Sequence, residues 1–528
     1  MSAAASTSAP ALALPARPAA NPWLIAAAVM AATFMEVLDT TVVNVSLPHI
    51  AGNMSVTPDE ATWVLTSYLV ANAIILPATG WLSSFFGRKR FLMACIVIFT
   101  IASAFCGAAT SLTMLIVARV FQGMGGGALQ PISQAVLLES FPPQKRGVAM
   151  SVFGLGVVVA PIIGPTMGGW MTDNYSWRWV FYINLPVGLL ALSLIQMYIH
   201  DPAYIRANRP GKIDLLGFGL LALWVASLQI VLDKGRQEDW LASSFIRTLL
   251  VMGVLGLVLF ITRELMTDHP LVNLRVLKNR NFLIGTTLMT VMGAVLYGSI
   301  ALLPLFLQTL LGYSALQSGL ATSPRGFGSI IGMIIIGRIL GFIDGRVLIA
   351  IGFSLLAFST WQFGNLDLII SKYSVIWPNI LNGFSTALVF VPMTTLALGT
   401  LKNEQMGNAT GIFNLMRNLG GGIGIATVST LIARGAQTHQ AILSAHTSNS
   451  NPIFLDSHAA LQNALTPELG PLAANGMATG ILYGELQQQA SLLAYIDTFR
   501  LLAWLCVLCL PLLFLFKKSR ARGSISAH

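Results

Sequence analysis

Two acidic residues, Glu36 and Asp39, lie three residues apart in the stretch MEVLDTTVVNVSLP at positions 35–48. The surrounding segment 23–47 is otherwise apolar and rich in small residues. An ionisable side chain in such a segment is costly, so it faces a cavity or a partner and indicates a functional site. A spacing of three residues puts both carboxyl groups on nearly the same side of a helix, about one turn apart. Groups so placed are candidates for taking up and releasing protons.

A cation, Arg119, occurs in a later apolar stretch, RVFQGMGGGALQP. Asp39 lies eight residues before the end of segment 23–47, and Arg119 lies seven residues after residue 112, where its own segment begins. At ~1.5 Å per residue, both lie roughly 11–12 Å from the same membrane boundary. Burial favours a neutral acid and a nearby Arg favours the carboxylate, so a conformational change can load or release a proton.

Three roles follow for these side chains. We expect Asp39 to be the main proton carrier, Arg119 to modulate it, and Glu36 to be a second titratable site or a cation-selecting wall of a cavity. The alternative is a fixed Asp39–Arg119 ion pair that only holds two helices together.

The composition places these residues in a membrane protein. Of 528 residues, 55% are hydrophobic and only 9% are charged, and the mean hydropathy is +0.73, whereas soluble domains carry roughly 25% charged residues. Apolar runs of about 20 residues, long enough to cross a bilayer, recur along the chain. We expect an all-α polytopic protein with fourteen spans, at 23–47, 62–85, 91–109, 112–134, 147–170, 179–198, 213–232, 245–265, 282–307, 316–340, 347–363, 374–398, 407–433 and 496–516.

The basic residues predict the orientation of these spans. The net charge of +10 comes mostly from short Lys/Arg clusters between apolar runs, which is typical of cytoplasmic loops and not of a nucleic-acid surface. Their placement favours an even number of spans, with both termini in the cytoplasm and a long polar loop, 437–490, outside. Four arginines lie within predicted spans, namely Arg119, Arg325, Arg417 and Arg500.

The sequence lacks the usual patterns of metal binding, enzymatic catalysis and ATP hydrolysis. The four cysteines lie in apolar runs, and the histidines lie in loops, at span ends or at the terminus, without metal-ligand spacing. No phosphate-binding glycine loop followed by Lys-Ser/Thr is present, so we expect no intrinsic ATPase activity. We therefore expect no enzyme, no metal and no cofactor, and energy must come from an ion gradient.

The two halves of the chain are weakly similar in sequence. GWLSSFFGRKR at 80–90 and GRILGFIDGR at 337–346 occupy comparable places, and internal repeats around a midplane site are typical of secondary transporters. We expect a disordered cytoplasmic tail (1–22), a six-helix bundle (23–200) and a linker with two extra transmembrane helices (201–281). A second six-helix bundle (282–516), with a periplasmic loop at 435–491, and a cytoplasmic tail (517–528) follow.

The stretch 80–90 resembles the loop motif of the major facilitator superfamily. Gly80, Leu82, Gly87, Arg88 and Lys89 match that motif, whereas Ser84 stands where the family usually has an acid that helps to lock the outward-open state. Arg119 and Gln122 also resemble the family motif R-x-x-Q-G, whose Arg is linked to proton transfer.

A glycine- and proline-rich string at 156–169, GVVVAPIIGPTMGG, resembles the antiporter motif of drug exporters. A small-xxx-small spacing allows close helix contact, and proline weakens the helical hydrogen-bond ladder. The string argues for export over uptake. Its conformational residues are Pro161, Gly164, Pro165, Gly168 and Gly169.

The stretches LDTTVVNVSLP and WRWVFYINLPVG resemble the EmrB/QacA group of fourteen-span drug:proton antiporters within this superfamily. The resemblance implies a major facilitator fold and proton-driven export of hydrophobic or amphiphilic compounds by alternating access at the bacterial inner membrane. It also implies a periplasmic adaptor of the membrane-fusion type (EmrA-like) and an outer-membrane channel (TolC-like). A stand-alone antiporter, a proton-coupled uptake symporter, a membrane-embedded enzyme and a membrane sensor are the alternatives.

Polar side chains within the spans are candidates for the substrate cavity. Arg325 and Arg417 serve either this role or a purely structural one, and most Met and Phe residues pack or face lipid. The candidate cavity residues are Asn44, Trp63, Gln122, Arg325, Asn414 and Arg417.

Overall fold

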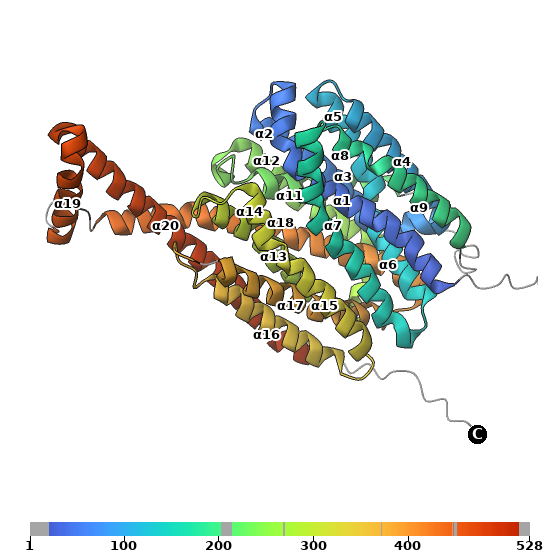
Figure 1. Ribbon diagram of the computed structural model, residues 1–528. Helices are drawn as coiled ribbons and strands as arrows, with labels where there is room; N and C mark the ends of the chain where they lie inside the picture. Colours follow the sequence, from blue (N-terminus) through green and yellow to red (C-terminus); the bar gives the residue numbers. More distant parts are fainter. Residues whose placement is uncertain are drawn as a thin grey trace, which may run out of the picture.

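The structure, a computed structural model, describes residues 21–201, 214–267, 270–370, 372–445, 447 and 451–516. The described chain is made of helices and short connections, without strands (Figure 1). The long helices are α1 (Pro22–Met54), α3 (Trp63–Phe86), α4 (Arg88–Ala108), α5 (Leu112–Gly126), α6 (Leu129–Ser140), α7 (Arg146–Asn174), α9 (Asn184–Tyr198), α11 (Leu215–Lys234), α12 (Ser244–Met266), α13 (Arg280–Thr309), α15 (Pro324–Ile339), α16 (Gly345–Phe363), α17 (Lys372–Leu398), α18 (Asn403–Ser444), α19 (Pro452–Leu469) and α20 (Pro471–Cys509). Shorter elements are α2 (Pro58–Ala61), α8 (Trp179–Tyr182), α14 (Ala315–Thr322), η1 (Pro143–Lys145), η2 (Trp240–Ala242), η3 (Leu274–Lys278) and η4 (Pro511–Leu515).

Fourteen helices in the described residues are long and apolar enough to cross a membrane. They form two six-helix bundles and an inserted pair, so the predicted fold is confirmed. In the N-terminal bundle α1 packs on α7, and α5 packs on both α3 and α4. In the C-terminal bundle α13 packs on α18, while α17 packs on α15 and α16. The bundles meet where α3 contacts α18 and where α7 contacts α15, and the inserted helix α11 lies against both α3 and α18.

Several span boundaries differ from the sequence prediction. The fourth span is not one helix: it breaks between α5 and α6 at Gly127 and Ala128. A run of glycines before the break lowers the helix propensity, and Pro131 just after it lacks an N–H to bond to the preceding turn. The tenth span breaks in the same way before Pro324, between α14 and α15. The first span continues beyond Leu47 to Met54 despite Pro48.

The expected outer loop is largely helical. Helix α18 has 42 residues and α20 has 39, so both continue well beyond the thickness of a bilayer. Together with α19 they form an extension that projects from one end of the molecule (Figure 1). The predicted start of the seventh span at 213, and most of both terminal tails, lie outside the described residues.

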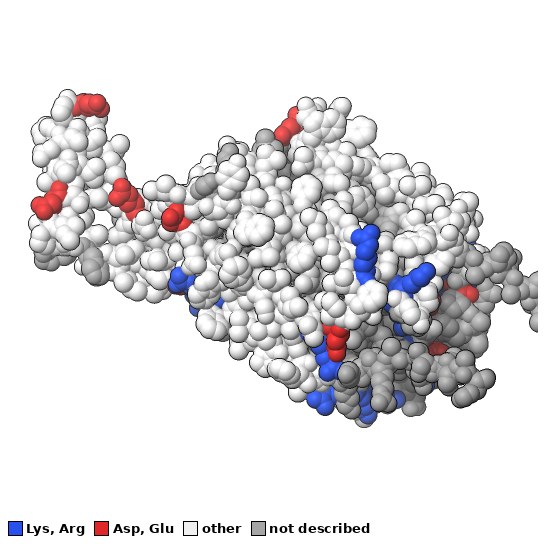
Figure 2. Space-filling model, turned by 60° about the horizontal axis from the view of Figure 1, so that its bottom comes forward, with Lys and Arg blue, Asp and Glu red and all other residues white. Residues whose placement is uncertain are grey.

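Both described ends of the chain lie at the same end of the molecule, opposite the extension (Figure 1). We call this end the terminal end and the opposite one the far end. Figure 2 shows most of the visible Lys and Arg side chains toward the terminal end, whereas the tip of the extension shows only Asp and Glu. Residues 435–499 indeed contain no Lys or Arg. The charge asymmetry on which the topology prediction rests is therefore present on the surface.

Candidate functional site

Asp39 lies in the middle of α1, fully buried, within a closed shell of hydrogen-bond donors. Its Oδ2 accepts from Arg119 Nη1 at 2.6 Å. Its Oδ1 accepts from Gln122 Nε2 at 2.8 Å and from Asn184 Nδ2 at 2.7 Å. The structure thus brings Asp39 and Arg119 together across α1 and α5, at the common depth that the sequence indicates. A buried charge so paired and bonded is tolerated in a low-dielectric interior.

Arg119 is also fully buried and is held from several sides. Its Nε donates to the Val64 carbonyl at 3.0 Å and its Nη1 donates to Gln122 Oε1 at 2.8 Å. The guanidinium carbon lies 4.2 Å from the centroid of the Tyr68 ring, a cation–π contact. Its Nη2 has no hydrogen-bond partner among the described residues.

Glu36 lies one turn from Asp39 and has partners of its own. Its Oε1 accepts from Tyr68 Oη at 3.3 Å and from Asn72 Nδ2 at 3.2 Å, and its Oε2 accepts from Gln130 Nε2 at 2.6 Å. All of these partners are uncharged, and the side chain is only 5% exposed. Tyr68 touches Arg119 with its ring and Glu36 with its hydroxyl, so it connects Glu36 to the cation that holds Asp39.

Arg417 and Asn414 do not line an open cavity in this conformation. Both are buried on α18 and reach across to α6 of the other bundle. Arg417 Nη2 donates to Gln130 Oε1, and Asn414 Nδ2 donates to Gln134 Oε1 at 2.7 Å. They connect the two bundles, a role that the sequence prediction did not give them.

The other candidate cavity residues lie apart from one another. Gln122 belongs to the Asp39 cluster, whereas Asn44 is exposed on α1 toward the far end. Trp63, at the start of α3, lies under Lys234 of the inserted helix α11, with Nζ 5.3 Å from a ring centroid. Arg325 donates to Ser299 at 3.2 Å and leaves Nη2 without a partner among the described residues. The structure does not gather these four residues into one site.

The loop motif lies at the terminal end and holds helix ends together. Gly87 has φ +87°, a conformation that favours glycine. Arg88 forms a bidentate pair with Glu139 at 2.6 and 3.1 Å, and the Lys89 N–H donates to Asp201 at 2.7 Å. Ser84, which replaces the usual acid, bonds its own helix at the Gly80 carbonyl. Carboxylates from outside the motif therefore hold the arginine and cap the helix.

In the terminal half of the molecule, glycines allow the two bundles to approach each other closely. A Cβ atom at Gly80 would lie 2.5 Å from Asn408 N of α18, and one at Gly411 would lie 2.7 Å from the Leu76 carbonyl of α3. On the other seam, Gly147 of α7 meets Leu340, the residue that follows α15. The bundles are thus in direct contact at the terminal end.

The glycine- and proline-rich string lies on α7 against α1. A Cβ atom at Gly164 would lie 2.2 Å from Thr41 Oγ1, and one at Gly168 would lie 2.9 Å from Val42 Cγ1. Gly169 is looser, at 3.8 Å from Val45. Pro161 and Pro165 belong to the same helix. This face therefore packs on the helix that carries both acids.

Sequence reasoning missed four polar partners of the acids, and also Ser103, which accepts from Gln122 and Asn184. Asn184 lies inside the stretch WRWVFYINLPVG, whose polar residue in an apolar run was the available signal. The others show no local signal, because their relevance depends on helices that meet only in the fold. The missed residues are Tyr68, Asn72, Ser103, Gln130 and Asn184.

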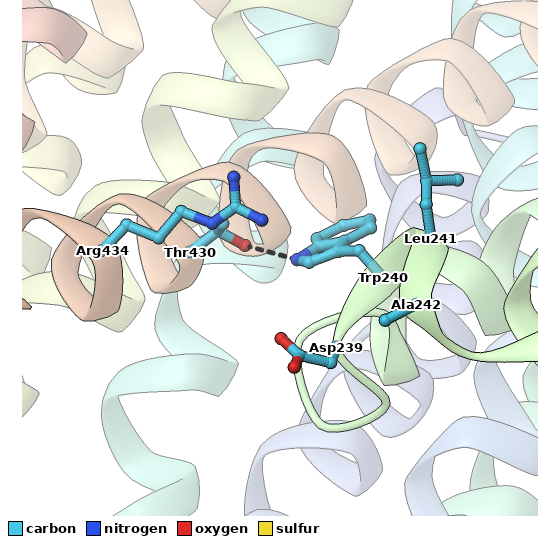
Figure 3. A pocket seen from close by; sticks show the side chains of 6 residues that line it. All are labelled: Asp239, Trp240, Leu241, Ala242, Thr430 and Arg434. Atoms are coloured by element: carbon cyan, nitrogen blue, oxygen red, sulfur yellow. Dashed lines mark hydrogen bonds between the residues drawn. The ribbon is translucent and has the colours of Figure 1, made fainter.

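A surface pocket of about 550 Å³ lies away from this cluster, at the far end between η2 and α18. Figure 3 shows Arg434 and Asp239 pointing toward the space beside the Trp240 ring, whose Nε1 donates to Thr430 at 3.2 Å. None of the residues predicted from sequence lines this pocket. Within the described part of the chain, no group of three or more His, Cys, Asp or Glu side chains could hold a metal ion.

Two helical bundles with buried charges at mid-depth are typical of secondary transporters. The sequence matches the Major Facilitator Superfamily over residues 29–425, and the chain belongs to this family of transporters.

Individual proteins within and near this family are also similar to the chain. The chain is 39% identical over 422 residues to the multidrug export protein EmrB of Escherichia coli strain K12, covering 80% of this chain and 82% of EmrB. It is 35% identical to the fatty acid resistance protein FarB of Neisseria gonorrhoeae, covering 92% and 94%. The predicted resemblance to EmrB and its group is confirmed. In fold, the chain is similar to the human organic anion transporter MFSD10, with a TM-score of 0.59 at 14% identity, covering 93% of this chain and 99% of that one.

Proposed function

We propose that this protein is a proton-driven exporter of hydrophobic and amphiphilic compounds that works by alternating access. The observation that carries the proposal is the buried Asp39–Arg119 pair at mid-depth. Such a pair is a weak device for stability, because desolvating two charges offsets most of their attraction. In a transporter, by contrast, a carboxylate whose cationic partner can move away is able to exchange a proton.

The antiporter-type string favours export, and its contact with the acid-bearing helix links it to proton exchange. Gly164 and Gly168 pack on α1 at Thr41 and Val42, two and three residues beyond Asp39. A movement of α7 on α1 therefore changes the surroundings of Asp39 directly. The names of the relatives EmrB and FarB, a multidrug export protein and a fatty acid resistance protein, favour lipophilic cargo.

The terminal end faces the cytoplasm in this proposal, and the protein lies in a bacterial inner membrane. The Lys/Arg side chains at the terminal end and their absence from residues 435–499 support this orientation. The contacts at Gly80 and Gly147 then close the protein on the cytoplasmic side. When the far side opens, cargo leaves toward the far end, and Asp39, which is buried in the conformation described here, takes up its next proton there.

A periplasmic adaptor and an outer-membrane channel complete the proposed assembly. The extension of α18, α19 and α20 projects at the far end and exposes apolar side chains such as Ile453, Leu472 and Tyr483. It offers a helical surface to an EmrA-like adaptor, which a TolC-like channel would continue. A stand-alone pump has no need of such a projection.

Vesicles that contain the purified protein test the central proposal. With an acidic lumen, adding a fluorescent lipophilic cation outside should make the lumen more alkaline while the dye accumulates inside. A proton symporter, the nearest alternative, would instead carry protons and cargo in the same direction. Dye movement without any change in lumen pH, across a panel of lipophilic compounds, would overturn proton coupling.

A further inference from the structure

Gln130 connects an acid of one bundle to a cation of the other. Its Nε2 donates to Glu36 Oε2 at 2.6 Å, while its Oε1 accepts from Arg417 Nη2 on α18. Glu36 and Gln130 belong to the N-terminal bundle and Arg417 belongs to the C-terminal bundle. The amide is therefore the middle member of a three-residue chain that crosses the interface.

Chemistry fixes the direction of this chain when Glu36 is charged. A guanidinium donates hydrogen bonds but cannot accept them, so the amide oxygen must face Arg417. The amide nitrogen then faces Glu36, and a carboxylate oxygen accepts from it. Each contact joins a donor to an acceptor.

A proton on Glu36 reverses this arrangement. Glu36 Oε1 already accepts from Tyr68 and Asn72, so we place the proton of the neutral acid on Oε2, the oxygen that faces Gln130. Two donors then point at each other. Rotating the amide by half a turn restores the bond to Glu36, but it turns Nε2 toward Arg417, which can only donate. Protonation therefore weakens one of the two bonds of Gln130, either to Glu36 or to the other bundle.

We propose that Gln130 is a positioning residue that reports the protonation of Glu36 to the interface between the bundles, loosening closure at the terminal end when Glu36 is neutral. The inference rests on the proposed proton-coupled function and adds the side chain that couples one acid to the gate. The two outer members of this relay, Glu36 and Arg417, are buried, and Gln130 between them is partly buried.

Other charged and titratable groups around Glu36 do not replace this path. They are Asp39 on the same helix, Tyr68 on α3, Arg119 on α5 and Arg417 on α18. Helix α6 contributes the uncharged Gln130 at this depth, and α7 carries charged residues only near its ends. Asp39, Tyr68 and Arg119 belong to the N-terminal bundle. Among these groups, Arg417 alone belongs to the other bundle.

A second link between the same helices supplies a matched control. Asn414 Nδ2 donates to Gln134 Oε1 at 2.7 Å, one helical turn along α6 from Gln130. This pair crosses the same interface and is fully buried, and its hydrogen bonds involve no acid. Gln134→Met should weaken closure at every pH, whereas Gln130→Met should also remove the response to pH.

The test measures opening of the terminal end directly. Spin labels on cysteines at Gln144 and Phe342, both exposed and on opposite bundles, report the distance across the gate. The native cysteines are all buried. Pulsed EPR at acidic and alkaline pH gives the pH-dependent change in the open fraction. The part of this pH-dependent change that Glu36→Gln removes is due to Glu36, and the part that it leaves is due to other groups such as Asp39.

We expect Gln130→Met to lose the same part of the pH-dependent change as Glu36→Gln, and the double variant to lose no more. Gln134→Met should keep the wild-type change. Arg417→Gln removes the other end of the hydrogen-bonded series and should give the same result as Gln130→Met. If one of these two variants does not fold, the other still tests the proposal. The proposal is overturned if Glu36→Gln or Gln130→Met keeps the full change, or if Gln134→Met loses as much. The measurement needs no cargo, so vesicles without proton-driven transport but with an intact pH response would overturn only the proposed function.

Discussion

Gly164 of α7 lies directly against Thr41 of α1, and a Cβ atom added at Gly164 would come within 2.2 Å of Thr41 Oγ1. The Thr41 hydroxyl is itself bonded to the Leu38 carbonyl at 2.9 Å, so it fills the space beside the glycine. Only a glycine allows the two helices to approach this closely. The contact lies two residues from Asp39, where any shift of α1 changes the surroundings of the acid.

We therefore predict that Gly164→Leu inserts into the membrane normally but no longer exports, because the larger side chain forces α7 away from α1. Gly164→Ala should reduce export partially. Drug resistance of cells that express each variant at wild-type levels measures the effect.

Gly169 on the same helix is the matched control. Its Cβ atom would lie 3.8 Å from Val45, an ordinary van der Waals distance. Gly169→Ala should leave resistance unchanged. Equal resistance for Gly164→Leu and the wild type would show that this face does not move during transport.

The sequence predicted the number of spans and the meeting of Asp39 with Arg119, because both depend on apolar run length and on counting along helices. It did not predict that α18 and α20 continue far beyond the membrane, since their outer turns are polar and read as a loop. It left open whether Arg417 has a cavity role or a structural one, because the acceptor Gln130 lies 287 residues away. Contacts between the bundles depend on the rotation of each helix, and a hydrophobic run does not encode that rotation.

Gly80 at the terminal end leads to a second prediction. A Cβ atom there would lie 2.5 Å from the Asn408 N of α18, so Gly80→Ala pushes the bundles apart where they now touch. We expect this variant to favour the conformation open at the terminal end and to lose most of its export. The distance between spin labels at Gln144 and Phe342 should increase.

Gly341 is the control for this change. It lies at the same end of the molecule, in the turn after α15, and nothing lies within 4 Å of an added Cβ atom. Gly341→Ala should keep the wild-type distance. If both variants give the same distance distribution as the wild type, the contact at Gly80 does not hold the gate.

Labelling of single cysteines tests the orientation. Ser444 ends α18 at the far end and is exposed, and Ser519 lies in the C-terminal tail, outside the described residues. Because the positive-inside rule puts the terminal end in the cytoplasm, an impermeant thiol reagent should label a cysteine at Ser444 in intact spheroplasts. A cysteine at Ser519 should react only after the membrane is opened. The opposite pattern would reverse the orientation.

Asp39 gives the sharpest prediction about mechanism. Asp39→Asn should bind cargo but lose transport driven by a pH gradient, because an amide cannot carry the proton. The variant should also be less stable by about 3–5 kcal/mol, since it leaves Arg119 charged and buried without a counter-ion. Proton release from vesicles and thermal unfolding of the purified protein measure the two effects separately.

The double variant Asp39→Asn with Arg119→Gln separates the proton-carrier role from a purely structural ion pair. Removing both charges together leaves no unpaired cation, so most of the lost stability should return. Transport should stay absent, because no titratable group replaces the carboxylate between Gln122 and Asn184. If the ion pair only held α1 and α5 together, the double variant would recover transport along with stability. Pumping at the wild-type rate by Asp39→Asn alone, at any pH near neutral, would likewise show that another group carries the proton.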